Sequence, residues 1–67
     1  MDVRTALKEG LAQLRDAHVC SFTLAAELLL LHTLGKDRTW LYAHPEETVS
    51  EADAERFYKL LTRRAAG

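Results

Sequence analysis

Three histidines and one cysteine are the side chains of this 67-residue chain that could bind a metal ion, because imidazole and thiolate are good zinc ligands. They are His18, Cys20, His32 and His44. Their spacing matches no zinc-binding pattern, and a histidine in a mostly apolar stretch, such as His32, is typical of a packed, hydrogen-bonded residue. The sequence therefore predicts no metal site.

Sequence motifs for catalysis are also missing. The chain has no glycine-rich phosphate loop, no H-E-x-x-H, no G-x-S-x-G and no cysteine–histidine pair with a spacing typical of a nucleophile and its base. We predict no catalytic residue and no cofactor-binding residue. The chain alone is not expected to be an enzyme.

Glu27 lies within the apolar run 24–34, so its carboxylate is expected to be partly buried and to lose part of its hydration. A buried carboxylate without a partner is costly. We therefore expect an arginine beside it, and the candidates are Arg38, Arg63 and Arg64. We interpret this as a structural ion pair rather than a catalytic one, because charges in small cores are often architectural.

Trp40, Leu41 and Tyr42 are consecutive, so on a helix their side chains point about 100° apart and cannot all enter one core. At least one aromatic ring is expected to be exposed. Trp40 and Tyr42 are our candidate partner-binding residues, because tryptophan and tyrosine are enriched in binding hot spots. The alternative is that Trp40 wedges between helices while Tyr42 covers its edge.

Composition limits the class of protein. Apolar residues make up 48% of the chain and charged residues 28%, which is typical of one folded domain over residues 1–67. The net charge of −1 and the pI of about 6.3 argue against a nucleic-acid partner. The longest apolar run is too short for a membrane span. With a single cysteine and no signal-peptide pattern, the chain is expected to be cytoplasmic.

Helix signals divide the chain into four segments. Asp2, Ser21, Asp37 and Ser50 are candidate N-caps, and Gly35 stands where a left-handed residue ends a helix. The second helix is apolar on nearly every side, so other helices must pack around it. The third, over 38–43, must end before Pro45.

Two further helices show a single apolar stripe each. The stripe positions are Val3, Ala6, Leu7, Gly10, Leu11 and Leu14 in the first helix and Ala54, Phe57, Tyr58, Leu61 and Ala65 in the last. Gly10 within its stripe indicates the close approach of another helix. The predicted fold is all-α, a small bundle of three long helices and one short helix around a central apolar helix.

The run 21–45, followed by R-R-A-A-G at the end of the chain, resembles the N-terminal domain of the HemK/PrmC family of protein-(glutamine-N5) methyltransferases. Its most specific positions are Ser21, Leu24, Glu27 to Leu30, His32, Leu34, Gly35, Arg38 and Leu41. Family members often have proline and aspartate where this chain has Phe22 and Ala25. Neither residue disturbs the helical pattern.

The resemblance implies a function. In that family the helical domain precedes a catalytic domain that binds S-adenosylmethionine. The catalytic domain is absent from this chain. The parent protein is then expected to be an S-adenosylmethionine-dependent methyltransferase that modifies the glutamine of the Gly-Gly-Gln motif in peptide chain release factors. The helical domain would help to bind the release factor, so its partners would be that factor and its own catalytic domain.

Two other classes remain as alternatives. One is a generic helical protein-interaction module that binds through Trp40 or Tyr42. The other is a helix-turn-helix DNA-binding domain formed by segments 21–34 and 38–43. The second is less favoured, because the presumed recognition helix is short and lacks basic surroundings.

Overall fold

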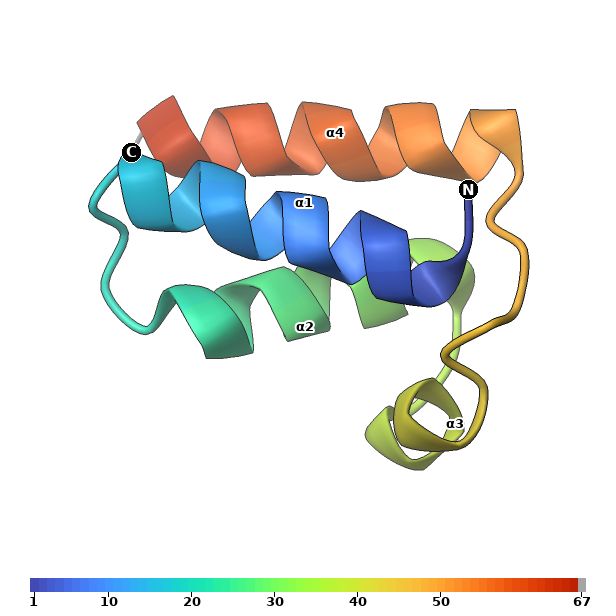
Figure 1. The fold of residues 1–67 in the computed structure, drawn as a ribbon. Coiled ribbons are helices and arrows are strands. Elements are labelled where there is room, and N and C mark those ends of the chain that lie inside the picture. The colour runs from blue at the N-terminus through green and yellow to red at the C-terminus, as the bar shows by residue number, and fades with distance from the viewer. Residues whose placement is uncertain (67) are drawn as a thin grey trace.

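Four helices form the fold in the computed structural model, which describes residues 1–66 (Figure 1). They are α1 (Val3–Asp16), α2 (Phe22–Leu34), α3 (Arg38–Ala43) and α4 (Glu51–Ala66). The long helices α1, α2 and α4 pack against one another, and α3 contacts α2 at the side of the bundle. The predicted all-α class with three long helices and one short helix is confirmed.

Helix starts follow the predicted caps at three of four places. The side chains of Asp2, Asp37 and Ser50 each accept a hydrogen bond from the backbone N–H three residues later, at 2.7, 2.8 and 3.2 Å. Gly35 ends α2 in the left-handed conformation, with φ of 68°. These local signals therefore fix most helix boundaries.

Ser21 is the exception. It directly precedes α2, but its backbone is left-handed, with φ of 54°, and its side chain makes no capping hydrogen bond. The predicted boundary is right and the predicted capping mechanism is wrong. The reason lies in the tight connection from α1, where His18 also has a positive φ of 60° and the Val19 N–H bonds back to the carbonyl of Leu14.

The core lies between the three long helices. Its buried apolar side chains are Val3, Ala6, Leu14, Ala26, Leu30, Leu31, Leu41, Val49, Phe57 and Leu61. Gly10 is buried as well, and a Cβ atom there would lie 2.7 Å from Cζ of Phe57. The predicted stripes of α1 and α4 thus face each other, and Gly10 permits the predicted close approach.

Other helices pack around α2, as predicted, but one face of α2 stays open. Although α2 contacts each of the other helices, Leu24 is 46% and Leu28 is 53% exposed. Helices α1 and α4 cover the sides of α2 that face away from these two leucines. Helix α3 has only six residues, which are too few to cover the leucine face along the whole of α2. An apolar strip on α2 is left open.

The connection between α3 and α4 is tied to the start of the chain. The N–H groups of Val3 and Arg4 donate to the carbonyls of Glu47 and Pro45 at 2.8 and 2.9 Å, and the Val49 N–H donates to Met1 at 2.8 Å. These bonds hold α3 in a defined position beside α2.

None of the described helices has the length and apolarity needed to cross a membrane.

Candidate partner-binding surface

Glu27 is the buried charge of the core, with only 12% of its side chain exposed. Its two carboxylate oxygens are both engaged by α3. Arg38 Nη2 lies 3.7 Å from Oε1, and the phenol of Tyr42 donates a hydrogen bond of 3.0 Å to Oε2. Two partners therefore satisfy a carboxylate that would be costly to bury alone.

The structure brings Arg38 to Glu27 and leaves the other two candidate arginines elsewhere. Arg63 lines a depression between α2 and α4, and Arg64 lies beside the start of α2. Because Arg38 is half exposed, its attraction to Glu27 is screened by solvent. An ion pair of this kind helps to position α3, and its geometry indicates no catalytic role.

Tyr42 acts as a donor in this cluster. Its hydrogen bond to Glu27, followed by desolvation and the negative charge of Glu27, raises the pKa of the Tyr42 phenol, while Arg38 opposes the shift. The phenol therefore keeps its proton at neutral pH and cannot serve as a base there. At the same time the residue is 64% exposed, so much of its ring is open to a partner.

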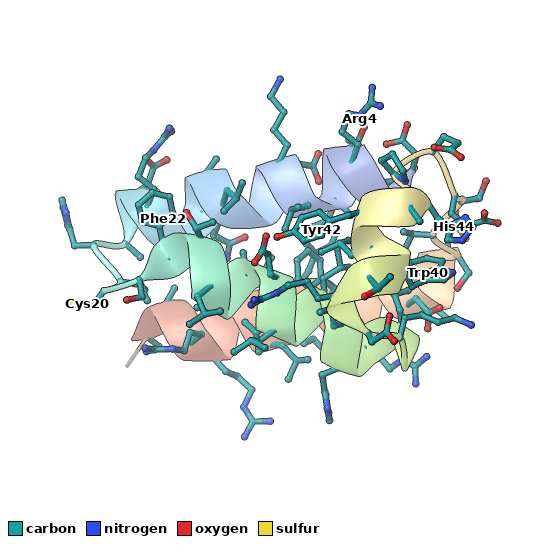
Figure 2. The ribbon with its side chains drawn as sticks, turned by 90° about the horizontal axis from the view of Figure 1, so that it is seen from below. Arg4, Cys20, Phe22, Trp40, Tyr42 and His44 are labelled. Carbon is teal, nitrogen blue, oxygen red and sulfur yellow. The ribbon has the colours of Figure 1, made fainter. Side chains whose placement is uncertain are left out.

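Trp40 belongs to a different side of α3. Its ring lies 5.3 Å from that of His44, and Lys36 Nζ lies 5.6 Å from the Trp40 ring centroid. Figure 2 shows Tyr42 directed toward the body of the bundle, whereas Trp40 and His44 lie on the opposite side of α3. The two predicted partner-binding residues thus do not form one continuous patch.

The exposed ring of Tyr42 and the guanidinium of Arg38 form what we call the α3 surface. It combines an aromatic ring with a cation, both held by Glu27, and this is the composition of many binding hot spots. Leu41, between Trp40 and Tyr42, is buried and anchors α3 to the core. This arrangement is suited to binding a partner.

Potential metal ligands are dispersed. In residues 1–66 no three histidine, cysteine, aspartate or glutamate side chains gather closely enough to hold a metal ion.

The cluster around Glu27 has one member that the sequence did not predict, namely Tyr42. No periodic signal connects residues 15 positions apart on two helices, so only the tertiary fold reveals this contact.

Comparison with known proteins links the chain to one family. The family model of the PrmC N-terminal domain matches residues 5–67. The chain is 33% identical over its full length to the release factor glutamine methyltransferase of Koribacter versatilis, and 31% identical over 96% of its length to that of Clostridium botulinum. A shorter match, 43% over 66% of the chain, is to the enzyme of the same name from Shewanella oneidensis.

The chain spans about a quarter of the length of the first two relatives, 24% and 23%, and 15% of the third. No solved structure matches it. The match to the family model nevertheless covers almost the whole chain, and the relatives carry one common name. The chain belongs to the family of PrmC N-terminal domains.

Proposed function

We propose that residues 1–67 form one domain at the N-terminal end of a protein-(glutamine-N5) methyltransferase and help it to bind peptide chain release factors. The catalytic domain would then methylate the glutamine of the Gly-Gly-Gln motif. The observation that carries this proposal is the match to the PrmC N-terminal domain over residues 5–67, together with relatives named release factor glutamine methyltransferase.

The α3 surface supports a binding role for this domain. Methyl transfer requires the glutamine nitrogen and the methyl donor to be held in a near-attack geometry, and contacts remote from the reacting atoms can fix that geometry. The methyl donor of the parent enzyme would be S-adenosylmethionine, bound by the catalytic domain. Tyr42, exposed and held at its hydroxyl by Glu27, offers a fixed anchor for the release factor.

A cytoplasmic setting belongs to the same proposal. The single cysteine of the chain, Cys20, fits a reducing compartment because no disulfide can form within the chain. Binding would involve protein partners, namely the release factor and the domain's own catalytic domain, with no direct contact to nucleic acid.

The test compares two substrates of the parent enzyme, a whole release factor and a short peptide containing Gly-Gly-Gln. Removal of residues 1–67 is expected to lower kcat/KM for the whole factor by roughly tenfold or more, which corresponds to about 1.4 kcal/mol of lost binding. The short peptide should be affected much less. Equal losses on both substrates would contradict recognition by this domain.

A point variant separates recognition from a general loss of stability. Tyr42→Ala removes the exposed ring of the α3 surface, and the matched control Thr39→Ala changes an exposed position of the same helix. Only Tyr42→Ala is expected to reduce kcat/KM for the whole factor. A similar reduction by both variants would count against the α3 surface.

A further inference from the structure

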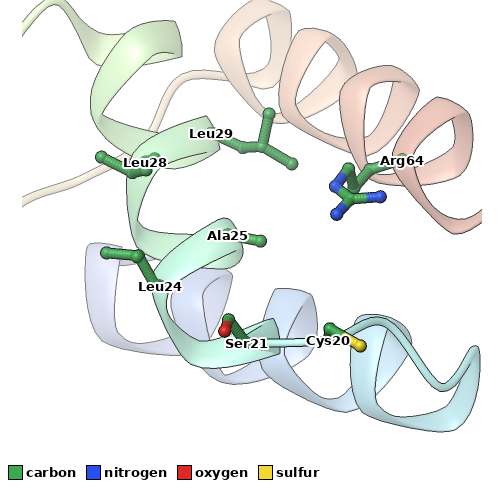
Figure 3. Close-up of a pocket in the computed structure, with 7 residues that line it drawn as sticks. All are labelled: Cys20, Ser21, Leu24, Ala25, Leu28, Leu29 and Arg64. Carbon is green, nitrogen blue, oxygen red and sulfur yellow. The ribbon is translucent and has the colours of Figure 1, made fainter.

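The open face of α2 leaves two large apolar side chains at the surface. Leu24 and Leu28 are one helical turn apart and about half exposed. Large apolar side chains that remain together at a surface often mark a site that another polypeptide covers. Figure 3 shows both leucines on one side of α2, while Ala25 and Leu29 lie on the side that faces Arg64.

A groove runs from these leucines toward the end of α4. Its volume is about 320 Å³, and we call it the leucine groove. It is lined by Cys20, Ser21, Leu24, Ala25, Leu28, Leu29 and Arg64. The guanidinium of Arg64 faces α2 across it (Figure 3) and makes no ion pair within the described chain. The groove therefore offers apolar walls and one cation that forms no ion pair with a carboxylate of residues 1–66.

The leucine groove lies beside the place where the polypeptide would continue. Arg64 is in the last turn of α4, two residues before the end of that helix at Ala66. That end lies near the connection between α1 and α2, which supplies Cys20 (Figure 1). In the relatives the matched part is only about a quarter of the protein, and the matching family is an N-terminal domain.

We propose that the leucine groove is the docking site of the polypeptide that follows residue 67, the first segment of the methyltransferase portion. An apolar side chain of that segment packs on Leu24 and Leu28, and a backbone carbonyl or a carboxylate accepts from Arg64. This contact orients the helical domain against the catalytic domain. The inference rests on the proposed position of this domain before a methyltransferase portion, concerns a surface other than the α3 surface and does not depend on release-factor binding.

A tethered segment fits the groove better than a second copy of the chain does. A stable dimer takes about 800 Å² from each partner, which is roughly 18% of the 4424 Å² of accessible surface here. The leucine groove is bounded by two turns of α2, the preceding connection and one side chain of α4. A segment joined directly to α4 binds intramolecularly at a high effective concentration, so a small contact is sufficient.

Cys20 provides the test, because it is exposed in the present chain and lines the leucine groove. The rate of its alkylation by a maleimide, followed by peptide mass spectrometry, is compared between the 67-residue chain and the chain extended through the residues encoded after Gly67. We expect at least a tenfold slower reaction in the extended chain. An unchanged rate, or a reading frame that ends at Gly67, would overturn the proposal.

Two controls make the result specific. In the double variant Cys20→Ser with Lys8→Cys, the cysteine at position 8 lies outside the groove. It should react at the same rate in the 67-residue chain and in the extended chain. In the extended chain, Leu24→Gln with Leu28→Gln should restore fast alkylation of Cys20, whereas Thr23→Gln, at an exposed position of α2 outside the groove, should not. Slower alkylation of both cysteines in the extended chain would overturn the proposal. Protection of Cys20 in the 67-residue chain that increases with its concentration would also overturn it and would indicate a dimer.

Discussion

The phenol of Tyr42 donates a hydrogen bond of 3.0 Å to Oε2 of Glu27, although the two residues lie 15 positions apart on different helices. Arg38 approaches the other oxygen of the same carboxylate at 3.7 Å. A helix as short as α3 is not stable by itself, so its orientation depends on such contacts and on the buried Leu41. Glu27 thereby controls how the α3 surface is presented.

A double-mutant cycle measures the contact between Glu27 and Arg38. Alanine substitutions at Glu27 and Arg38 are expected to show a coupling of about 0.2–1 kcal/mol in the free energy of unfolding, because Arg38 is half exposed and the pair is partly screened. The matched cycles of Glu27 with Arg63 and with Arg64 should give couplings near zero. Equal coupling to all three arginines would contradict the observed geometry.

Phenolate absorbance follows the ionisation of both tyrosines of the chain together, and single substitutions of their carboxylate partners separate the two contributions. The hydrogen bond to Glu9, then desolvation and the charge of Glu9, raise the pKa of Tyr58 to about 12, and Glu27 raises that of Tyr42. Glu9→Gln should lower only the pKa of Tyr58, and Glu27→Gln only that of Tyr42. A tyrosine that titrates at 10 in the unmodified folded chain would contradict these contacts.

The same shift of Tyr58 predicts how stability changes in alkali. Its pKa is about 12 in the folded chain and ordinarily 10.0, so the folded state holds the proton more firmly. The resulting stability is fully present below pH 10 and is lost as the pH rises through about 12. Denaturant unfolding at pH 9 to 12 should show this loss in the wild type and a smaller loss in Glu9→Gln.

Gly10→Ala is expected to destabilise the bundle by about 0.5–2 kcal/mol. Alanine favours a helix over glycine by up to about 1 kcal/mol, but overpacking a core costs about 1–3 kcal/mol. The added Cβ would lie 2.7 Å from a Phe57 ring that is fully buried and cannot withdraw into solvent. Chemical denaturation gives the free energy of unfolding.

Phe57→Leu is the matched background for that variant, because the smaller side chain leaves room for the new methyl group. In this background Gly10→Ala should cost less than it does alone. Strictly additive effects of the two substitutions would show that the contact between α1 and α4 is looser than the structure indicates.

Asp2 gives a stability change in acid. The hydrogen bonds from Thr5 lower the pKa of Asp2 below its usual 3.8, so its contribution is present above pH 3.8 and is lost as the pH falls through the lower folded value. Asp2→Asn retains a capping acceptor without the titrating charge. Thermal unfolding from pH 7 to pH 2 should therefore show a wild-type advantage that disappears in acid, whereas a constant difference would contradict this cause.

Much of the fold could be predicted from the sequence because its helix signals are local. Asp2, Asp37 and Ser50 act through a backbone group three residues away, and Gly35 acts through its own φ angle. The stripe containing Gly10 even indicated a close helix contact. Such features need no knowledge of distant partners.

The rest depends on tertiary geometry that no local pattern encodes. The left-handed backbone of Ser21 follows from the path of the connection, and the exposure of Leu24 and Leu28 follows from how few helices surround α2. The pairing of Tyr42 with Glu27 likewise arises from the position of α3, which the N-terminal backbone bonds help to fix.

Binding of the release factor by this domain can be measured directly in one titration. The isotope-labelled chain is mixed with the release factor of its own organism, and backbone amide shifts are followed by NMR, with Tyr42→Ala and the control Thr39→Ala measured alongside. We expect localised shifts around Arg38 and Tyr42 that Tyr42→Ala weakens and Thr39→Ala preserves. No shifts at high concentration, or shifts unaffected by Tyr42→Ala, would contradict binding through the α3 surface.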